Sequence, residues 1–375
     1  MPYISEFRNP AAAAALVRSI ERQVGQAIAS RGGEPIRLME VCGTHTVAIF
    51  RHGIRDVLPP GIRLLSGPGC PVCVTPNDEI DRAIALAGAP GVILTTFGDM
   101  VRVPGTRTSL QEARAAGADV RIVYSPLDAL RLAQANPTRE VVFLAVGFET
   151  TTPAVAGALY EARRLGVPNF TICAAHKVVP PALRLLLDSP ETRVDGFLLP
   201  GHVSAIIGGR PYEFIASDYR VPGVIAGFEP LDILQSVDML LAQIVAAEPK
   251  IEIQYRRTVR WEGNETAARY VAEVFEPCDV NWRGLGGLPG SGLRLRPEYS
   301  AFDAALRFPT ESPVSREHSG CLCGSVLRGI IDPPACPLFD RACTPERPIG
   351  PCMVSTEGTC AAWHQYAGLA SAGDS

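Results

Sequence analysis

The sequence has no long hydrophobic run and little net charge, and each absence narrows the possible functions. Its longest apolar run, Val141 to Phe148, is much shorter than the roughly 18 residues that a membrane span needs. The net charge is −4 over 375 residues, so neither a polyanion nor an acidic membrane surface is a favoured partner. The composition therefore argues against a membrane-spanning protein and against a nucleic-acid-binding one.

A recognisable secretory leader is also missing. The apolar stretch at 11–17 is followed at once by Arg18, Glu21 and Arg22, and no small-residue cleavage site follows it. We therefore expect a helix at this position and a soluble, cytosolic protein. In that reducing compartment the eleven cysteines are poor candidates for disulfides, so clustered cysteines point to metal ligation or thiol chemistry. The isolated Cys173 and Cys278 are expected to pack as small apolar side chains.

Six of the eleven cysteines lie in the last 55 residues, among prolines that favour open loops. Four of them have the spacing C-x14-C-x6-C-x16-C, namely Cys321, Cys336, Cys343 and Cys360. A structural zinc site prefers C-x2-C pairs, which this segment lacks, since Cys321 and Cys323 are separated by one residue. A four-thiolate iron–sulfur cluster tolerates wider spacing, so it is the favoured interpretation over a zinc module or incidental buried thiols.

Between residues 36 and 230, short apolar runs alternate with helical stretches, which is typical of parallel α/β architecture. The expected strands are Ile36–Val41, Ile62–Leu65, Val92–Thr95, Val120–Tyr124, Val141–Val146, Phe170–Ala174, Gly196–Leu199 and Val224–Ala226. These runs span under 200 residues, which is short for a (β/α)8 barrel. Two small open-sheet, Rossmann-like domains facing across a cleft are favoured instead, with a break at Asn136-Pro137.

The pattern changes after Glu229. We expect a long helix at 231–247, an edge strand at 250–260, a second helix at 266–275 and a glycine-rich turn or linker at 284–292. Two earlier helices, at 79–87 and 154–165, connect expected strands.

Polar or reactive residues follow nearly every expected strand. They are Cys42 with Thr44 and His45, then Cys70, Asp99, Glu149, His176 with Lys177, and His202. Because ligands bind at the carboxyl edge of parallel sheets, these groups are expected to line one rim. Taken singly, Asp99, Glu149, His176, Lys177 and His202 are better explained as caps or structural contacts than as functional groups.

The segment GPGCPVCVTPNDEI contains the pair Cys70-x-x-Cys73 just before an expected helix. Thr75 is the expected N-cap and Pro76 the first helical residue. The positive end of a helix favours thiolate over thiol, as redox-active or metal-binding pairs require, although Glu79 and Asp78 partly oppose this. The alternative, half of a zinc site, lacks a second pair to complete it.

The segment MEVCGTHT places Cys42 at a strand end, beside a histidine that titrates near neutral pH. A single cysteine at such a position is either a buried side chain or a reactive thiol. Its place on the expected rim makes the second interpretation as reasonable as the first.

Several uncommon strings occur in an order that resembles the HypD family of [NiFe]-hydrogenase maturation factors. They are MEVCGTHT, SGPGCPVCVTP, GFETTTP, LPGHVS and CTPERPIGPCMVSTEGTCAA. The resemblance covers nearly the whole chain. It implies α/β domain I at 34–137, α/β domain II at 138–229, and a third domain formed by 1–33 with 230–375.

The resemblance also implies site residues and cofactors. It places a [4Fe–4S] cluster on Cys321, Cys336, Cys343 and Cys360, and leaves Cys323 and Cys352 as further thiols of open role. It makes Cys42 an iron ligand, with Cys70 and Cys73 as a nearby pair that either binds iron or cycles as a disulfide.

The family works with a HypC-type chaperone, which supplies a second cysteine to the iron, and a HypE-type cyanide donor. The resemblance implies a scaffold on which an Fe(CN)2CO unit is built for the hydrogenase large subunit. Soft thiolates suit such iron, and Thr44 and His45 are candidates to hydrogen-bond cyanide or steer protons. An iron–sulfur-dependent thiol–disulfide oxidoreductase remains the alternative function.

Overall fold

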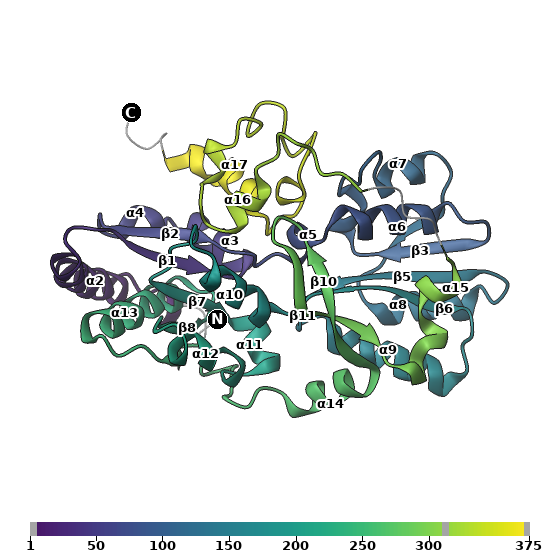
Figure 1. Cartoon of the computed structure of the whole chain (residues 1–375), viewed down its shortest axis with the longest axis horizontal. Helices are drawn as coiled ribbons and strands as arrows, with labels where there is room; N and C mark the ends of the chain where they lie inside the picture. Colours follow the sequence, from purple (N-terminus) through teal and green to yellow (C-terminus); the bar gives the residue numbers. More distant parts are fainter. Residues whose placement is uncertain (1–5, 310–314, 371–375) are drawn as a thin grey trace.

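The protein has two lobes, here called lobe A and lobe B, and each is built around one parallel β-sheet. The sheet of lobe A is described first. The computed structural model describes residues 6–309 and 315–370. The sheet has five strands in the order β2-β1-β7-β8-β9, all parallel (Figure 1). Their bounds are β1 Ile36–Glu40, β2 Ile62–Ser66, β7 Gly196–Pro200, β8 Gly223–Ala226 and β9 Ile251–Ile253.

The second parallel sheet forms the centre of lobe B and has four strands in the order β4-β3-β5-β6. Their bounds are β3 Val92–Thr96, β4 Val120–Ile122, β5 Glu140–Gly147 and β6 Phe170–His176. β3 and β5 are almost entirely buried, which explains why their sequences are nearly continuous apolar runs.

All eight expected strands are present. They form two open parallel sheets, as expected, and not a (β/α)8 barrel. The expected division near residue 137, however, does not match the sheets. β1 pairs with β2 on one side and with β7 on the other, so residues 92–176 form an insertion within lobe A. Asn136 and Pro137 lie in the turn between α8 and β5, inside lobe B. The runs of both sheets are predominantly apolar, so their sequences do not specify which strands pair.

Helices from both ends of the expected third domain cover lobe A instead. Asn9 caps α2 by accepting hydrogen bonds from the N–H groups of Ala11 and Ala12, and this helix packs on α13 (Figure 1). The lobe A helices are η1 Glu6–Arg8, α2 Pro10–Ser30, α3 Gly43–Arg51, α4 Ile54–Val57, α11 Gly201–Ile207, η3 Arg210–Tyr212, α12 Glu213–Ser217 and α13 Pro230–Ala246. The expected helix at 231–247 is thus α13.

Lobe B carries its own helices and an antiparallel hairpin. The helices are α5 Pro71–Val74, α6 Asn77–Ala87, η2 Gly98–Arg102, α7 Leu110–Ala115, α8 Pro126–Ala135, α9 Thr152–Leu165, α10 Val179–Asp188, α14 Glu265–Val274, η4 Pro297–Phe302 and α15 Ala304–Arg307. The hairpin pairs β10 Phe275–Trp282 with β11 Gly286–Leu295. The glycine-rich linker expected at 284–292 is therefore largely a strand, and the strand expected at 250–260 is limited to β9.

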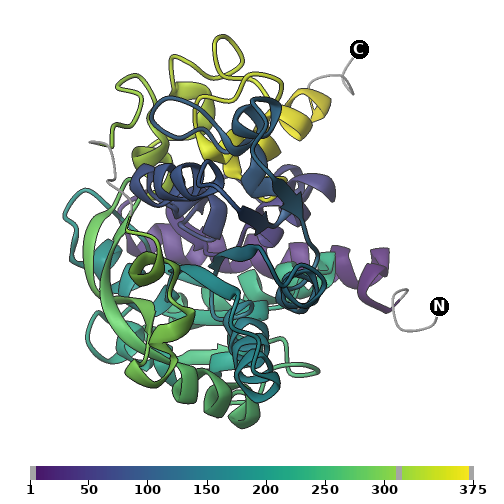
Figure 2. The same cartoon turned by 90° about the vertical axis from the view of Figure 1, so that its right-hand side faces the viewer.

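Residues 315–370 form a separate C-terminal unit with short helices and long loops. Its helices are α16 Cys323–Leu327, η5 Pro333–Ala335, η6 Pro351–Met353 and α17 Thr359–Ala370. Figures 1 and 2 show this unit, in yellow, above both lobes. Only this part of the expected third domain is separate, because the helices of 10–30 and 230–309 bury their apolar faces against the lobes.

A continuous hydrophobic core joins the three parts. One cluster of buried residues contains Val41 of lobe A, Val146 of lobe B and Val354 of the C-terminal unit. A largely buried ion pair lies nearby, where Nζ of the fully buried Lys177 contacts Glu79 Oε1 at 2.5 Å. The carboxyl ends of both sheets thus meet in one packed region. Within residues 6–309 and 315–370, none of the helices combines the length and apolarity that crossing a bilayer requires.

Candidate thiol site at the junction of the lobes

Two cysteines occupy the first position before a helix at the carboxyl edge of lobe A. Cys42 follows β1 and is the N-cap of α3, while Cys70 follows β2 and is the N-cap of α5. The Cys70 sulfur accepts a hydrogen bond from the Cys73 backbone N–H at 3.3 Å. The expected helix start at Thr75 is displaced, because Thr75 ends α5 and its hydroxyl donates to the Pro71 carbonyl.

Two glycines bring the Cys42 and Cys70 loops into contact. The Gly43 N–H donates to the Gly69 carbonyl at 3.1 Å. A Cβ on Gly69 would lie 2.3 Å from the Cys42 backbone nitrogen, and one on Gly43 would lie 2.3 Å from the Glu357 carbonyl oxygen. Only glycine permits these approaches, so both positions are required for the loops and the C-terminal unit to meet.

The Cys42 thiol is buried and held in its protonated form. Burial raises its pKa to about 12, and the carboxylate of Glu357 adds to the effect, whereas hydrogen bonds from Thr44 oppose it. Its backbone N–H donates to the carboxyl group of Glu40 at 3.2 Å. A free Cys42 therefore remains a thiol at neutral pH, and a cation that binds its sulfur must displace the proton.

The pKa values of Cys70 and Cys73 are shifted in opposite directions. Burial raises the pKa of Cys73, but hydrogen bonds from the thiols of Cys352 and Cys70 outweigh it and leave that pKa lowered to about 6. The pKa of Cys70 is raised well above its ordinary value by burial and by its bond with Cys73. The pair therefore combines one thiolate with one thiol, an arrangement suited to disulfide exchange or metal binding.

All six C-terminal cysteines line one cavity. They are Cys321, Cys323, Cys336, Cys343, Cys352 and Cys360. The sulfurs of Cys323 and Cys352 lie 2.9 Å apart, and Cys352 also hydrogen-bonds with Cys73. A continuous series of thiol contacts therefore runs from Cys70 through Cys73 and Cys352 to Cys323 in the cavity. Cys323 and Cys352, expected to be further thiols of open role, form the link.

The loop at 355–358 ties the C-terminal unit to both lobes at this point. The Ser355 hydroxyl donates to Asp99 of lobe B at 3.2 Å, and it also hydrogen-bonds the Cys70 side chain. The Thr44 hydroxyl of lobe A donates to Glu357 Oε1 at 2.7 Å. Cys42, Cys70 and Cys73 are therefore brought together beneath this loop.

Thr44 and His45 offer no free donor to a ligand in this arrangement. The hydroxyl proton of Thr44 is used by Glu357, and His45 Nε2 lies 3.2 and 3.0 Å from the Ala226 and Gly227 carbonyls. Nε2 must therefore carry the proton, which leaves Nδ1 as a buried acceptor without a partner among the described residues. Burial lowers the His45 pKa to about 4, so the ring is neutral at pH 7, and its one N–H is already used by the two carbonyls.

The remaining rim residues have mainly structural partners. Glu149 accepts a hydrogen bond from the Val179 N–H at 2.9 Å, and Lys177 pairs with Glu79. His202 is exposed and stacks on Phe228, with ring centres 3.9 Å apart. Glu79 was expected to oppose the stabilisation of a thiolate by the nearby helix end. Its ion pair with Lys177 balances the negative charge of Glu79.

The buried His176 and Glu149 give the protein a specific dependence of stability on pH. Burial, with the Lys177 charge, lowers the His176 pKa from 6.5 to about 3, so the unfolded chain takes up a proton first as the pH falls. Burial raises the Glu149 pKa from 4.5 to about 7, so here the folded chain holds the extra proton. His176 therefore destabilises the fold as pH falls below 6.5, and Glu149 destabilises it as pH rises above 4.5.

We expect opposite effects from His176→Phe and Glu149→Gln between about pH 4.5 and 6.5. The first should lower the slope of unfolding free energy against pH by about 1.4 kcal/mol per pH unit, and the second should raise it by about the same amount. Urea unfolding at several pH values measures both slopes. Two variants that shift the slope in the same direction would contradict the assigned protonation states.

Sequence reasoning missed several residues of the site. Glu357 and Ser355 were overlooked beside Cys360, although they stand in the string STEGTC and bridge the C-terminal unit to Thr44 and Asp99. Glu40 lies within the expected strand Ile36–Val41 and was given no role there, yet it is buried and accepts hydrogen bonds from the Thr46 hydroxyl and the Cys42 N–H. The sequence signal that could have identified Glu357 is its position in a polar string, STEGTC, three residues before the clustered Cys360.

The described residues contain no group of three or more His, Cys, Asp or Glu side chains close enough to share a single metal ion. A mononuclear zinc site would need its sulfurs within about 4 Å of one another, given Zn–S bonds of about 2.3 Å. A cluster that takes one thiolate on each iron needs its ligands spread more widely around a cavity. The cavity is lined by the six cysteines together with apolar side chains such as Val326 and Phe339, and no three of these cysteines form a close group.

Comparison with known proteins gives the same family throughout. Residues 12–367 match the HypD family, described as "Hydrogenase formation hypA family". The chain is 50% identical to the hydrogenase maturation factor HypD of Rhodobacter capsulatus, over 99% of this chain and 100% of that protein. It is 48% identical to the factor of the same name from Escherichia coli K12, over 98% of both chains. The factor from Rhizobium leguminosarum is also 48% identical, over 98% of this chain and 96% of that protein.

Proposed function

The chain belongs to the HypD family of hydrogenase maturation factors, and from this premise we propose that it is the scaffold on which an Fe(CN)2CO unit is assembled. The observation that carries the proposal is the convergence of Cys42, Cys70 and Cys73 beneath a loop of the cysteine-rich C-terminal unit. Iron, cyanide and carbon monoxide are here the cargo of the protein.

Cys42 is the proposed iron ligand of this chain. It is a soft donor at a buried position, which suits low-spin iron bearing strong-field ligands. Its thiol proton must leave when iron binds, because the cation takes the place of the proton on the sulfur. A HypC-type chaperone supplies the second thiolate in this proposal, and a HypE-type protein delivers cyanide before transfer to the hydrogenase large subunit.

A [4Fe–4S] cluster is the proposed resident cofactor, and the donor set fits it. Cys321, Cys336, Cys343 and Cys360, the four cysteines that the family resemblance implies, would hold the cluster, and all four line the cavity. Cys323 and Cys352 line it as well, and their sulfurs contact each other. When bound, such a cluster stores and releases single electrons. The unequal acidities of Cys70 and Cys73 prepare this pair to form a disulfide with loss of two electrons and of the one proton on Cys70, and to return by the reverse reaction.

Anaerobic copurification with a HypC-type partner in cytoplasmic extract tests the proposal. We expect infrared bands of iron-bound cyanide and carbon monoxide, a brown colour and about four irons of the cluster type per chain, together with inorganic sulfide. A colourless protein that contains one zinc and shows no such bands would contradict the proposal.

The continuous series of thiols also supports a second function, that of an iron–sulfur-dependent thiol–disulfide oxidoreductase acting on a protein partner. Cys73 contacts both Cys70 and Cys352, so electrons can pass between the pair and the C-terminal unit. Thiol trapping of the wild-type chain in redox buffers separates the two functions. An oxidoreductase requires a reversible two-electron couple at Cys70 and Cys73 in the absence of iron cargo.

A further inference from the structure

The tip of the β10–β11 hairpin contacts both α5 and α16. On the side of α5, the Arg283 backbone N–H donates to the Val74 carbonyl at 2.8 Å. On the side of α16, a Cβ added to Gly284 would lie 2.4 Å from the Gly324 Cα, so only glycine permits this approach. The tip therefore lies against the segment that carries Cys73 and also against the C-terminal unit (Figure 1).

Arg283 holds the chain that follows Cys73 with three hydrogen bonds. Besides the bond from its backbone N–H to Val74, its Nε donates to the Thr75 carbonyl at 2.9 Å and a terminal nitrogen donates to the Asn77 side-chain oxygen. These acceptors are uncharged, so hydrogen bonding leaves the positive charge of the guanidinium in place. Arg283 is only 4% exposed, and a buried charge without a nearby opposite charge is costly.

The nearby opposite charge is the Cys73 thiolate. Burial raises the pKa of Cys73, hydrogen bonds from Cys352 and Cys70 lower it, and the charge of Arg283 lowers it further. The charge of Glu357 acts in the opposite direction. Oxidation to a disulfide removes the negative charge of Cys73 but leaves the guanidinium where it is, so Arg283 stabilises the reduced pair and not the disulfide.

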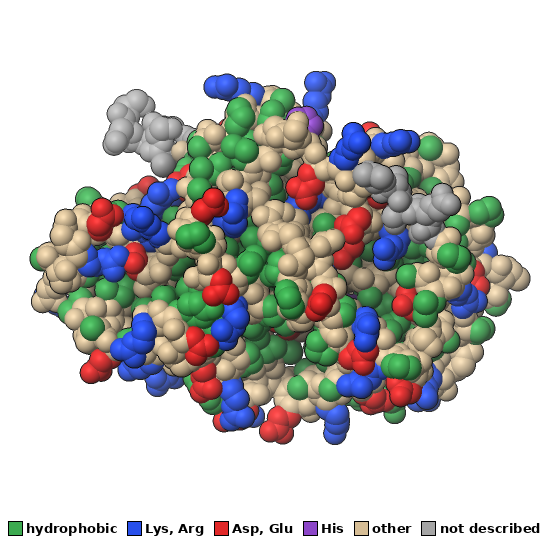
Figure 3. All heavy atoms as spheres, in the orientation of Figure 1, with side chains coloured by type: hydrophobic (Ala, Val, Ile, Leu, Met, Phe, Trp, Pro, Cys, Tyr) green, Lys and Arg blue, Asp and Glu red, His purple; other side chains and the backbone are tan. Residues whose placement is uncertain are grey.

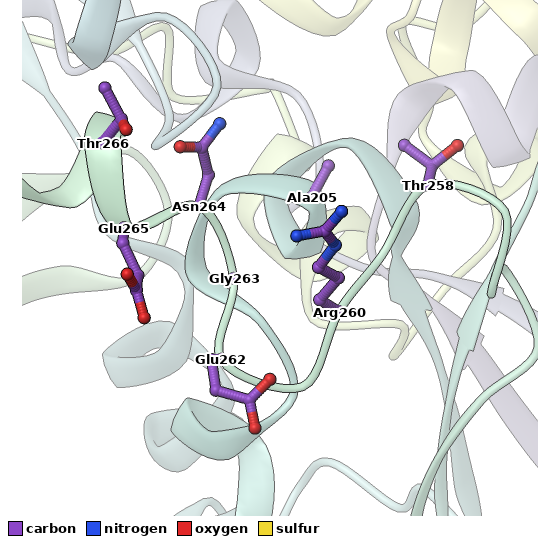
Figure 4. Close-up of a pocket in the computed structure, with 8 residues that line it drawn as sticks. All are labelled: Ala205, Thr258, Arg260, Glu262, Gly263, Asn264, Glu265 and Thr266. Atoms are coloured by element: carbon purple, nitrogen blue, oxygen red, sulfur yellow. The ribbon is translucent and has the colours of Figure 1, made fainter.

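Burial distinguishes Arg283 from the other cations. Of the lysines and arginines that the structure describes, only Lys177 and Arg283 are buried. Lys177 is paired with Glu79, whereas the side-chain hydrogen bonds of Arg283 go to uncharged groups. Figure 3 shows Lys and Arg side chains, in blue, on the surface, where water and salt screen their charge. Figure 4 shows an exposed example, Arg260, in a pocket of lobe A whose lining contains two glutamates and no cysteine.

From this arrangement we propose that Arg283 is a positioning residue of the Cys70–Cys73 pair, which fixes the segment that carries Cys73 and stabilises the reduced pair against the disulfide. The inference rests on the proposed redox function and adds the residue that sets its equilibrium. With glutathione disulfide as the oxidant, the Cys73 thiolate displaces one glutathione as a thiolate. Cys70 then closes the protein disulfide, and its proton leaves with the second glutathione as a thiol. Two electrons thus pass from the two protein sulfurs to the glutathione disulfide.

The test is the equilibrium of the pair with glutathione in the anaerobic holoprotein, measured by thiol trapping and mass spectrometry. Arg283→Met should shift this equilibrium about tenfold towards the disulfide, which is about 30 mV for a two-electron couple, because the thiolate loses its neighbouring cation. Arg283→Gln retains hydrogen-bond donors without the charge, so it should give the same shift with less disturbance of the hairpin. Arg283→Lys keeps the charge and should stay within about threefold of the wild-type value.

Two variants control for the loss of an arginine as such. Arg296, at the base of the same hairpin, is bonded in a similar way, with its backbone N–H on the Val274 carbonyl and its Nε on the Ala272 and Phe275 carbonyls. Arg296→Met should therefore weaken the hairpin in thermal unfolding, yet leave the thiol equilibrium unchanged within about twofold. The exposed Arg260→Met should change neither quantity.

A wild-type equilibrium in Arg283→Gln would overturn the inference. It would also be overturned if Arg283→Lys shifted the equilibrium as far as the uncharged variants do, or if Arg296→Met shifted it equally. A wild-type pair that never oxidises refutes the redox function, and the inference with it. A wild-type pair that cycles normally while every variant keeps the same equilibrium refutes the inference alone.

Discussion

Replacing Cys42 by alanine should abolish the infrared bands of iron-bound cyanide and carbon monoxide in the chain purified with its small partner. The reason is that no other thiol is free to replace the buried Cys42 sulfur at the end of β1. The neighbouring pair, Cys70 and Cys73, is already hydrogen-bonded to Cys352 through Cys73. Loss of a first ligand should reduce iron occupancy by more than the roughly 10- to 100-fold that loss of a supporting residue costs.

Two measurements make this prediction specific. Cys173→Ala removes another buried thiol whose pKa burial also raises to about 12, but this thiol lies on β6, and its removal should leave the bands intact. The iron and sulfide of the C-terminal unit should be equal in both variants. Bands that persist in Cys42→Ala at wild-type intensity would exclude Cys42 as the iron ligand.

Replacing Cys336 by alanine should eliminate the brown chromophore together with about four irons and four sulfides per chain. Cys336 lines the cavity, and its sulfur makes a long contact of 4.0 Å to the Gly320 carbonyl. A cluster with three thiolates is readily lost, because the loops around it have little apolar mass with which to order themselves. Iron and sulfide analysis with visible absorption measures the effect.

Two control variants distinguish cluster ligands from the other thiols. Cys278→Ala, on β10, removes a half-buried cysteine outside the cavity and should retain all the iron. Cys352→Ala should also retain the iron, while thiol trapping should show that the Cys70–Cys73 pair is no longer reduced. Full iron content in Cys336→Ala, or loss of iron in Cys352→Ala, would show that the four ligands are assigned incorrectly.

The strands could be predicted from the sequence, but their pairing could not. Each run such as Val141–Val146 is apolar because both faces of a central parallel strand are buried, and this property is shared by strands of both sheets. Whether β1 pairs next with β3 or with β7 depends on packing between segments about 160 residues apart. The hairpin was missed for a different reason, since β10 contains Pro277 and β11 is rich in glycine, which individually argue against strands.

The site was predictable where reactive residues occur at strand ends, as with Cys42 and Cys70. The residues that complete it were not, because Glu357 reaches Thr44 across 313 positions of sequence. The assignment of hydrogen-bond roles also needed coordinates. His45 is a reasonable proton donor on sequence alone, and only the two carbonyls at its Nε2 show that this proton is already used.

The insertion of lobe B into lobe A determines the order in which the protein can be completed during synthesis. β1 and β2 leave the ribosome first, but β1 lacks its second neighbour until β7 has been made, by which time all four strands of lobe B can have paired. Glu357 joins Thr44 only after that. A nascent chain therefore carries Cys42 for most of its translation without the surroundings that bury it, and the thiol site is the last part of the molecule to form.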